Sequence, residues 1–137
     1  MRTDEQSTEL SIVVPVWGTR HDLPRLLPAL QRALEGVEPR SEILVCASGT
    51  SLRAIVEAAS AVFVESKGSG YGDILQTGIE AAQGDRVITM DADFAYAADF
   101  VPIIWAHRDD AEVVIGSRYV RGAVAEMASA VGPRAGC

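Results

Sequence analysis

The chain has 137 residues, which suits one domain, and 48% of them are hydrophobic while 23% are charged, so the composition excludes a wholly disordered protein. Its net charge of −7 excludes proteins that bind nucleic acid through a basic surface. Its two cysteines, Cys46 and Cys137, fit neither a disulfide framework nor a zinc site, and the polar start and short apolar runs predict no signal peptide or membrane span. We therefore expect a cytoplasmic protein.

The first predicted elements are a strand and a helix. Residues 10–17 form a continuous apolar run, which predicts a fully buried strand. Residues 21–37 predict a helix with Asp22 as its N-cap and Gly36 at its end. One face of this helix carries only leucines, namely Leu23, Leu26, Leu27, Leu30 and Leu34.

The next three elements are shorter. Residues 42–47 predict a second strand. A short helix over residues 50–60 follows, with Thr50 or Ser51 as its cap. Residues 61–65 predict a third strand, and the loop SKGSGYG comes after it.

The second half continues the alternation. Residues 73–83 predict a helix that stops at Gly84, with a face formed by Ile74, Leu75, Gly78, Ile79 and Ala82. Residues 86–90 predict the fourth strand. A helix over residues 98–109 and a fifth strand over residues 111–117 follow.

Strands that alternate with helices predict βαβ units and an α/β fold with a doubly wound, mostly parallel sheet and helices on both faces. The strands lack alternating polarity, as expected where both faces of a sheet are covered.

Two acids directly after the fourth strand are the clearest candidate site. Asp91 and Asp93 are separated by Ala92 alone, and alternate residues of an extended segment point the same way. Ligands of open α/β sheets bind at the carboxyl ends of the strands. Carboxylate oxygens suit Mg²⁺ or Mn²⁺, which often bind substrate phosphates as well. The pattern indicates a clamp for metal and diphosphate, and a solvated turn is the alternative.

Two cationic residues lie at other predicted strand ends. Lys67, the single lysine, is in a loop spaced G-x-G-x-G, which does not match a dinucleotide-binding fingerprint, yet the loop leads into a helix N-terminus that favours anions. Arg118 follows the fifth strand and could bind a phosphate bidentately. The alternatives are a flexible turn and a surface arginine.

Four segments together resemble a known family. SIVVPVWGTRHDLPRLLPAL, EILVCASGTS, GYGDILQTGIEAAQGDRVITMDADF and AEVVIGSRYVRG occur in the order and spacing of family 2 glycosyltransferases, and resemble most the dolichyl- or polyprenyl-phosphate mannosyltransferase branch. The resemblance covers residues 10–122. It implies a GT-A, Rossmann-like domain there, between a polar segment at residues 1–9 and an Ala/Gly-rich tail at residues 123–137, for which disorder is one expectation.

The resemblance also implies roles for individual residues. Asp91 and Asp93 would hold Mg²⁺ or Mn²⁺, and the catalytic residues would be Asp93 and Arg118. We expect the nucleotide-sugar donor to contact Pro15, Trp17, Ser48, Lys67, Asp91 and Ala92.

The implied reaction is an inverting transfer of a hexose, mannose from GDP-mannose being the commonest case, to a polyprenyl or dolichyl phosphate. Such an acceptor is already ionised at neutral pH and needs no strong base. A lipid acceptor would place the cytoplasmic protein peripherally at the membrane face.

The chain departs from the family pattern at several positions. Ala47 and Ser48 stand where the family has two acids, Gly18 and Thr19 where it often has Asn-Glu, and Ala95 where some members have a metal-binding Gln. The family's domain also extends further, so we expect an incomplete C-terminal part and self-association through an exposed sheet edge. An inactive GT-A domain that at most binds nucleotide is one alternative. A sugar nucleotidyltransferase, suggested by WGTR, is another.

Overall fold

A computed structural model gives the fold of this chain. It describes the backbone alone at residues 95–97, 114–116 and 128–130, and backbone and side chains at residues 7–18, 21–37, 40–92 and 98–109.

The centre of the fold is a four-stranded parallel sheet. Its strands are β1 (Leu10–Val16), β2 (Ser41–Ser48), β3 (Val62–Ser66) and β4 (Arg86–Thr89), in the order β3-β2-β1-β4. Every residue of β1 is buried. The uninterrupted apolar run that predicted this strand therefore reflects burial on both faces.

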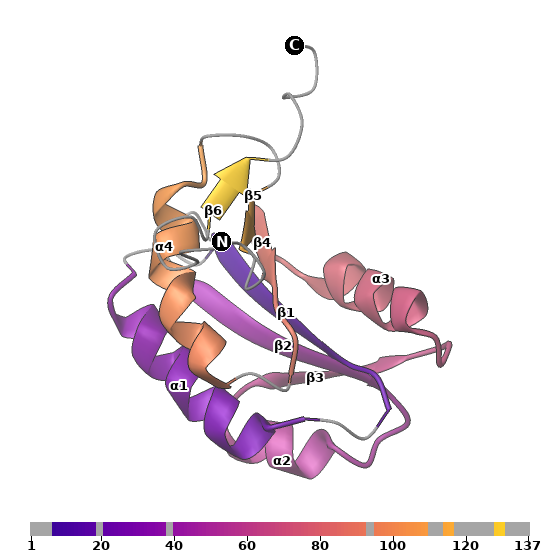
Figure 1. Cartoon of the computed structure of the whole chain (residues 1–137). Helices are drawn as coiled ribbons and strands as arrows, with labels where there is room; N and C mark the ends of the chain where they lie inside the picture. Colours follow the sequence, from indigo (N-terminus) through magenta and orange to yellow (C-terminus); the bar gives the residue numbers. More distant parts are fainter. Residues whose placement is uncertain are drawn as a thin grey trace.

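Helices cover both faces of the sheet (Figure 1). The helices α1 (Leu23–Glu35), α2 (Arg53–Ala58) and α4 (Val101–Ala106) lie on one face, and a 3-10 helix, η2 (Ala95–Phe100), leads into α4. The helix α3 (Tyr71–Ala81) lies on the other face. The predicted doubly wound α/β architecture is thus confirmed.

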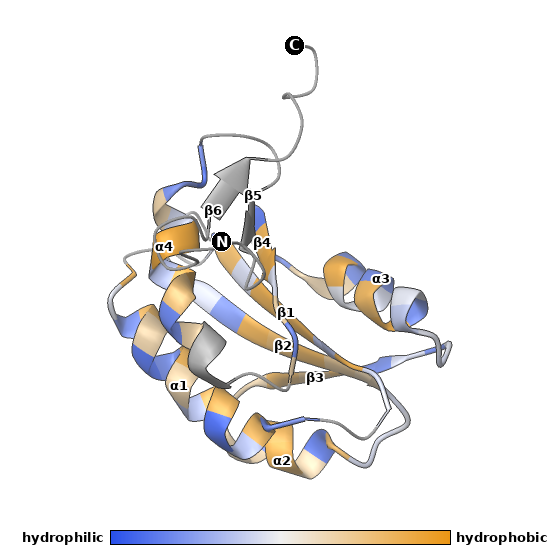
Figure 2. Cartoon of the chain, in the orientation of Figure 1, coloured by the Kyte–Doolittle hydropathy of each residue, from blue (hydrophilic) through white to orange (hydrophobic). Residues whose placement is uncertain are grey.

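Two apolar clusters hold these layers together, and Figure 2 shows the hydrophobic residues along the central strands. Alternate residues of β1 and β2 point to opposite faces, so Ile12 packs toward α1 while Val13 packs toward α3. The predicted leucine face of α1 is buried from Leu23 to Leu30. On α3, Ile74 and Gly78 are buried as expected, but Ile79 is 44% exposed, so its assignment to the buried face was wrong.

Several predicted helix ends differ from the structure. Neither Thr50 nor Ser51 caps α2 with its side chain; the cap position is Leu52, and the Thr50 carbonyl accepts a hydrogen bond from the Arg53 N–H. Asp22 does occupy the N-cap position of α1, without a side-chain capping bond. The third helix begins at Tyr71, two residues earlier than predicted, so Tyr71 and Gly72 of the predicted loop belong to its first turn.

Gly84 does not stop α3, which ends at Ala81, and has another role. Its N–H donates to the hydroxyl of buried Ser11, which donates in turn to the Glu42 carboxylate at 2.6 Å. A Cβ at position 84 would lie 2.7 Å from the Ser11 oxygen. Glycine is therefore required here by the close approach of the α3–β4 connection to β1.

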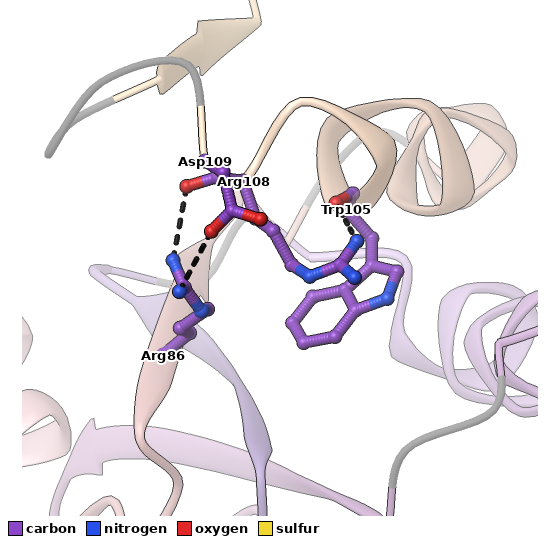
Figure 3. A network of polar contacts seen from close by, with 4 residues as sticks. All are labelled: Arg86, Trp105, Arg108 and Asp109. Carbon is purple, nitrogen blue, oxygen red and sulfur yellow. Dashed lines mark hydrogen bonds and ion pairs between the residues drawn. The ribbon is translucent and has the colours of Figure 1, made fainter.

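An ion pair links the end of α4 to the start of β4 (Figure 3). The Arg86 guanidinium donates to Asp109 and to the Arg108 carbonyl, both at 2.9 Å, while Arg108 lies over the Trp105 ring. Because Arg86 and Asp109 are both largely exposed, the pair contributes at most about 1 kcal/mol.

A second, two-stranded sheet pairs β5 (Val114–Gly116) with β6 (Ala128–Ala130) in antiparallel fashion. Within the described residues β5 does not join the parallel sheet, which leaves β3 and β4 as its outer strands. None of the described helices is long and apolar enough to cross a bilayer.

Candidate functional site

The strand order reverses between β1 and β4, and we call the space outside the carboxyl ends of these two strands the crevice. From β1 the chain builds outward through β2 to β3, then crosses the sheet through α3 and returns to form β4 on the other side of β1. The strand order therefore reverses between β1 and β4. Ligands of open α/β sheets bind at such a point, outside the carboxyl ends of the strands.

Pro15 marks the point where β1 and β4 separate. The ladder between the two strands ends at the pair Val13–Thr89, followed by one hydrogen bond from the Met90 N–H to the Val13 carbonyl. In a parallel ladder, alternate residues bond the same neighbour, so Pro15 is the next residue that would donate to β4. Proline has no N–H, and the ladder cannot continue.

Asp91 lies at this opening. It follows Thr89 by two residues and is exposed, whereas the next residue, Ala92, is buried. The Ala92 carbonyl accepts a hydrogen bond from the Asp22 N–H at 2.7 Å, which anchors the segment to the start of α1. Strand alternation from Thr89, which shares its face with Val13, directs Asp91 to the face that α3 covers.

The ends of β1 and β2 contribute further predicted residues. Pro15 is buried within β1, and Trp17 beyond the end of the strand is 61% exposed. Ser48, the last residue of β2, is exposed and lies on the α3 face. Ala47, at a position where the resemblance led us to expect an acid, is only 5% exposed and packs in the apolar cluster on the opposite face. A carboxylate there would need to leave this cluster or find a partner.

Lys67 is exposed in the loop after β3 and makes no hydrogen bond or ion pair with another described residue. The same loop lies close to Asp73: a Cβ added to Gly68 would overlap the Asp73 carboxylate. Asp73 lies in the first turn of α3. It places a negative charge at the helix N-terminus, which stabilises the helix there and competes with an anionic ligand.

Tyr71 is a further residue near the carboxyl ends of the strands, and it was not among the predicted site residues. It is the first residue of α3 and 43% exposed. Burial, and then the negative charge of Asp91, raise the pKa of its phenol. The signal was present in the sequence as the spacing of Tyr71, Ile74 and Gly78 on one helix face.

Other predicted site residues lie outside what the structure describes. Asp93 and Arg118, the two predicted catalytic residues, fall there, and Ala95 is described in its backbone alone. Their predicted roles stay predictions.

The described residues fit a divalent cation at Asp91, because its carboxylate is exposed and accepts no hydrogen bond from a described residue. Within the described ranges no three His, Cys, Asp or Glu side chains gather into a metal site. Mg²⁺ and Mn²⁺ commonly use one or two carboxylates and complete their shell with water and phosphate oxygens. A cation at Asp91 would therefore depend on Asp93 and on a bound diphosphate.

Comparison with known proteins adds a family match. The model of the family described as "Glycosyl transferase family 2" matches residues 11–126. An undecaprenyl-phosphate 4-deoxy-4-formamido-L-arabinose transferase of Proteus mirabilis is 27% identical over 127 residues, which are 86% of this chain and 39% of that protein. A dolichol-phosphate mannosyltransferase of Pyrococcus furiosus is 28% identical over 126 residues, 86% of this chain and 35% of the relative.

A third relative, an undecaprenyl-phosphate 4-deoxy-4-formamido-L-arabinose transferase of Pseudomonas syringae, is 31% identical over 117 residues and 79% of this chain. The chain thus spans between 35% and 39% of the length of these relatives.

Proposed function

The chain belongs to glycosyl transferase family 2, and we propose that it forms the donor-binding part of an enzyme that transfers a hexose from a nucleotide sugar to a polyprenyl or dolichyl phosphate. The observation that carries this proposal is the exposed Asp91 carboxylate at the reversal of strand order, where Pro15 opens the sheet. The relatives' names support the acceptor class, since each names a dolichol or undecaprenyl phosphate.

Within this proposal the sugar is mannose and its donor is GDP-mannose. The dolichol-phosphate mannosyltransferase among the relatives supports this choice, while the arabinose transferases support another sugar as the alternative. The proposal places the protein in the cytoplasm, at the membrane face where a lipid acceptor lies.

Each predicted site residue would contact a different part of the donor. Trp17 offers an exposed ring for stacking on the nucleobase, and Ser48 offers a hydroxyl at the neighbouring strand end. Asp91 together with Asp93 would hold Mg²⁺ or Mn²⁺, and Arg118 would pair with a phosphate of the donor or acceptor. The cation would supply positive charge that stabilises the leaving nucleoside diphosphate. Buried Ala92 fixes the Asp91 backbone through its bond to Asp22.

A second candidate function is nucleotide binding without transfer. The observation that favours it is Ala47, which is packed in the apolar cluster at the position where the resemblance leads us to expect an acid that contacts the base. A sugar nucleotidyltransferase is a third reading, and it differs in product because it would release pyrophosphate.

Calorimetric titration of GDP-mannose and of UDP-glucose, each with Mn²⁺, tests the donor site. We compare the wild-type protein with Asp91→Asn, and use Asp85→Asn as the matched control, because Asp85 is an exposed acid just before β4, at the opposite end of that strand. We expect metal-dependent binding that weakens at least roughly tenfold in Asp91→Asn and is unchanged in Asp85→Asn.

Product analysis then separates the candidates. Release of nucleoside diphosphate on addition of undecaprenyl or dolichyl phosphate identifies a transferase. Binding without release supports the second candidate, and pyrophosphate release from a nucleoside triphosphate supports the third. A folded wild-type protein that binds neither nucleotide sugar in the presence of Mn²⁺ contradicts the proposed donor site.

A further inference from the structure

Tyr71 lies on the side of α3 that faces the sheet. Tyr71, Ile74 and Gly78 are spaced i, i+3 and i+7, which puts them on one helix face. Ile74 is 1% exposed and packs in the cluster that contains Val13 and Cys46. Gly78 lies so close to the same two side chains that its Cβ would be 2.6 Å from Val13 and 2.5 Å from Cys46. Tyr71 therefore continues a stripe whose other members contact the sheet.

Tyr71 and Asp91 lie at nearly the same height along the direction of the strands. The helix runs back toward the start of β4, so its first residue lies nearest the carboxyl edge of the sheet. At about 1.5 Å of rise per residue, Tyr71 is about 10 Å from Gly78 in that direction. Because Gly78 lies against Val13, Tyr71 is at the height of a residue about three positions beyond Val13 along the strand direction. Asp91 is two residues beyond Thr89, the partner of Val13, so the two side chains reach nearly the same level.

The two side chains also share one side of the sheet. Strand alternation points Asp91 to the α3 face, and Tyr71 extends from α3 above that face. The phenol hydroxyl makes no hydrogen bond with another described residue, so its donor is available beside the crevice.

We propose that Tyr71 binds the donor, an inference that rests on the donor site proposed above. The Tyr71 ring forms the α3-side wall of the crevice between β1 and β4. Its hydroxyl donates a hydrogen bond to the diphosphate that Asp91 holds through a cation. A diphosphate oxygen fits because it accepts a hydrogen bond from a neutral phenol. The Asp91 carboxylate repels a bare anion, so the phenol's contribution depends on the metal-bound diphosphate.

Tyr71→Phe tests this role, because it removes the hydroxyl and keeps the ring. Thr77→Val is the matched control: it removes a hydroxyl from the same helix, but one that donates to the Asp73 carbonyl within α3. The probes are GDP and UDP with Mn²⁺, and guanosine and uridine as ligands without phosphate. Calorimetry gives the affinities, and thermal unfolding shows that each variant is folded.

We expect Tyr71→Phe to weaken binding of the preferred nucleoside diphosphate roughly tenfold, the range of a hydrogen bond to a charged group. Affinity for the matching nucleoside should stay unchanged, and Thr77→Val should bind as the wild type does. In the Asp91→Asn background, Tyr71→Phe should cause little further loss.

Three results would overturn the inference. Wild-type affinity of Tyr71→Phe for the diphosphate shows that the hydroxyl does not reach it. Equal losses for the diphosphate and the nucleoside show that Tyr71 acts on the fold or the base. If Tyr71→Phe still weakens diphosphate binding tenfold in the Asp91→Asn background, the group that the hydroxyl binds does not depend on Asp91. Failure of the wild-type protein to bind either nucleoside diphosphate with Mn²⁺ rejects the donor site itself, and is thus distinct from these results.

Discussion

Gly78 of α3 lies directly against Cys46 of β2. An added Cβ would be 2.5 Å from the Cys46 sulfur, a separation that real Cβ atoms do not adopt. The absence of a side chain at position 78 therefore sets how closely α3 packs on the sheet. It also sets the height of Tyr71 above the crevice, because the two residues belong to one rigid helix.

Gly78→Ala should destabilise the protein by about 1 to 3 kcal/mol, because the methyl group overpacks the contact between α3 and the sheet. Gly72→Ala is the matched control in the same helix, since a Cβ there meets no atom within 4 Å. It should be neutral or stabilise by up to about 1 kcal/mol through helix propensity. Urea unfolding monitored by circular dichroism measures both. Equal stability of the two variants would contradict the close packing at Gly78.

Cys46 should be unreactive in the folded protein. Burial raises the pKa of its thiol from 9.0 to about 11, so at pH 8 it is protonated and inaccessible. In a Cys137→Ser variant, where Cys46 is the remaining thiol, a thiol reagent should label the native protein far more slowly than the urea-unfolded protein. Rapid labelling without denaturant would contradict the burial of Cys46.

The same shift predicts how stability changes with pH. The folded-state pKa lies above the unfolded value, so the unfolded chain releases the Cys46 proton first as the pH rises. The thiol's stabilising contribution is therefore complete below pH 9.0 and is lost toward pH 11. Unfolding free energies of Cys137→Ser at several pH values across this window should fall more steeply than those of Cys46→Ala/Cys137→Ser. Parallel slopes would show that the thiol does not contribute.

Trp17 should report nucleotide binding directly. It is 61% exposed at the end of β1, whereas Trp105 is partly buried and packs against the core. The protein has two tryptophans, so Trp105→Phe leaves Trp17 as the single tryptophan, whose fluorescence can be excited selectively. We expect GDP or UDP with Mn²⁺ to quench its fluorescence, and Trp17→Leu to weaken binding roughly tenfold through lost stacking. Unchanged affinity in Trp17→Leu would remove Trp17 from the donor site.

Self-association through a sheet edge is a further prediction. Val87 on the outer strand β4 is 38% exposed, and Val62 on the outer strand β3 is 46% exposed. Charged side chains on edge strands oppose pairing between molecules. Light scattering should show a mass that rises with concentration in the wild type and rises less in Val87→Lys. Val62→Lys tells which edge is involved, and a wild-type monomer at all concentrations would contradict the prediction.

The sequence by itself determined the order of the elements and the architecture. Continuous apolar runs predicted β1 and β2, because strands covered on both faces need apolar side chains throughout. The leucine spacing predicted the buried face of α1. The two acids after the fourth predicted strand indicated the candidate site, because ligands of open α/β sheets bind at the carboxyl ends of the strands. The expectation that this strand is buried was wrong, since most residues of β4 are exposed.

The tertiary structure decided what depends on the packing of distant segments. The strand order put the ends of β1 and β4 side by side, and only this order gives Pro15 its role in opening the crevice. Gly84 reads as a helix stop in the sequence, but it is required by its contact with Ser11, which is far away in the chain. Gly78 lets α3 approach the sheet closely, and this packing sets the position of Tyr71 at the start of the helix. Local patterns record which side chains are buried, whereas the partner of each side chain is set by the packing of one element on another.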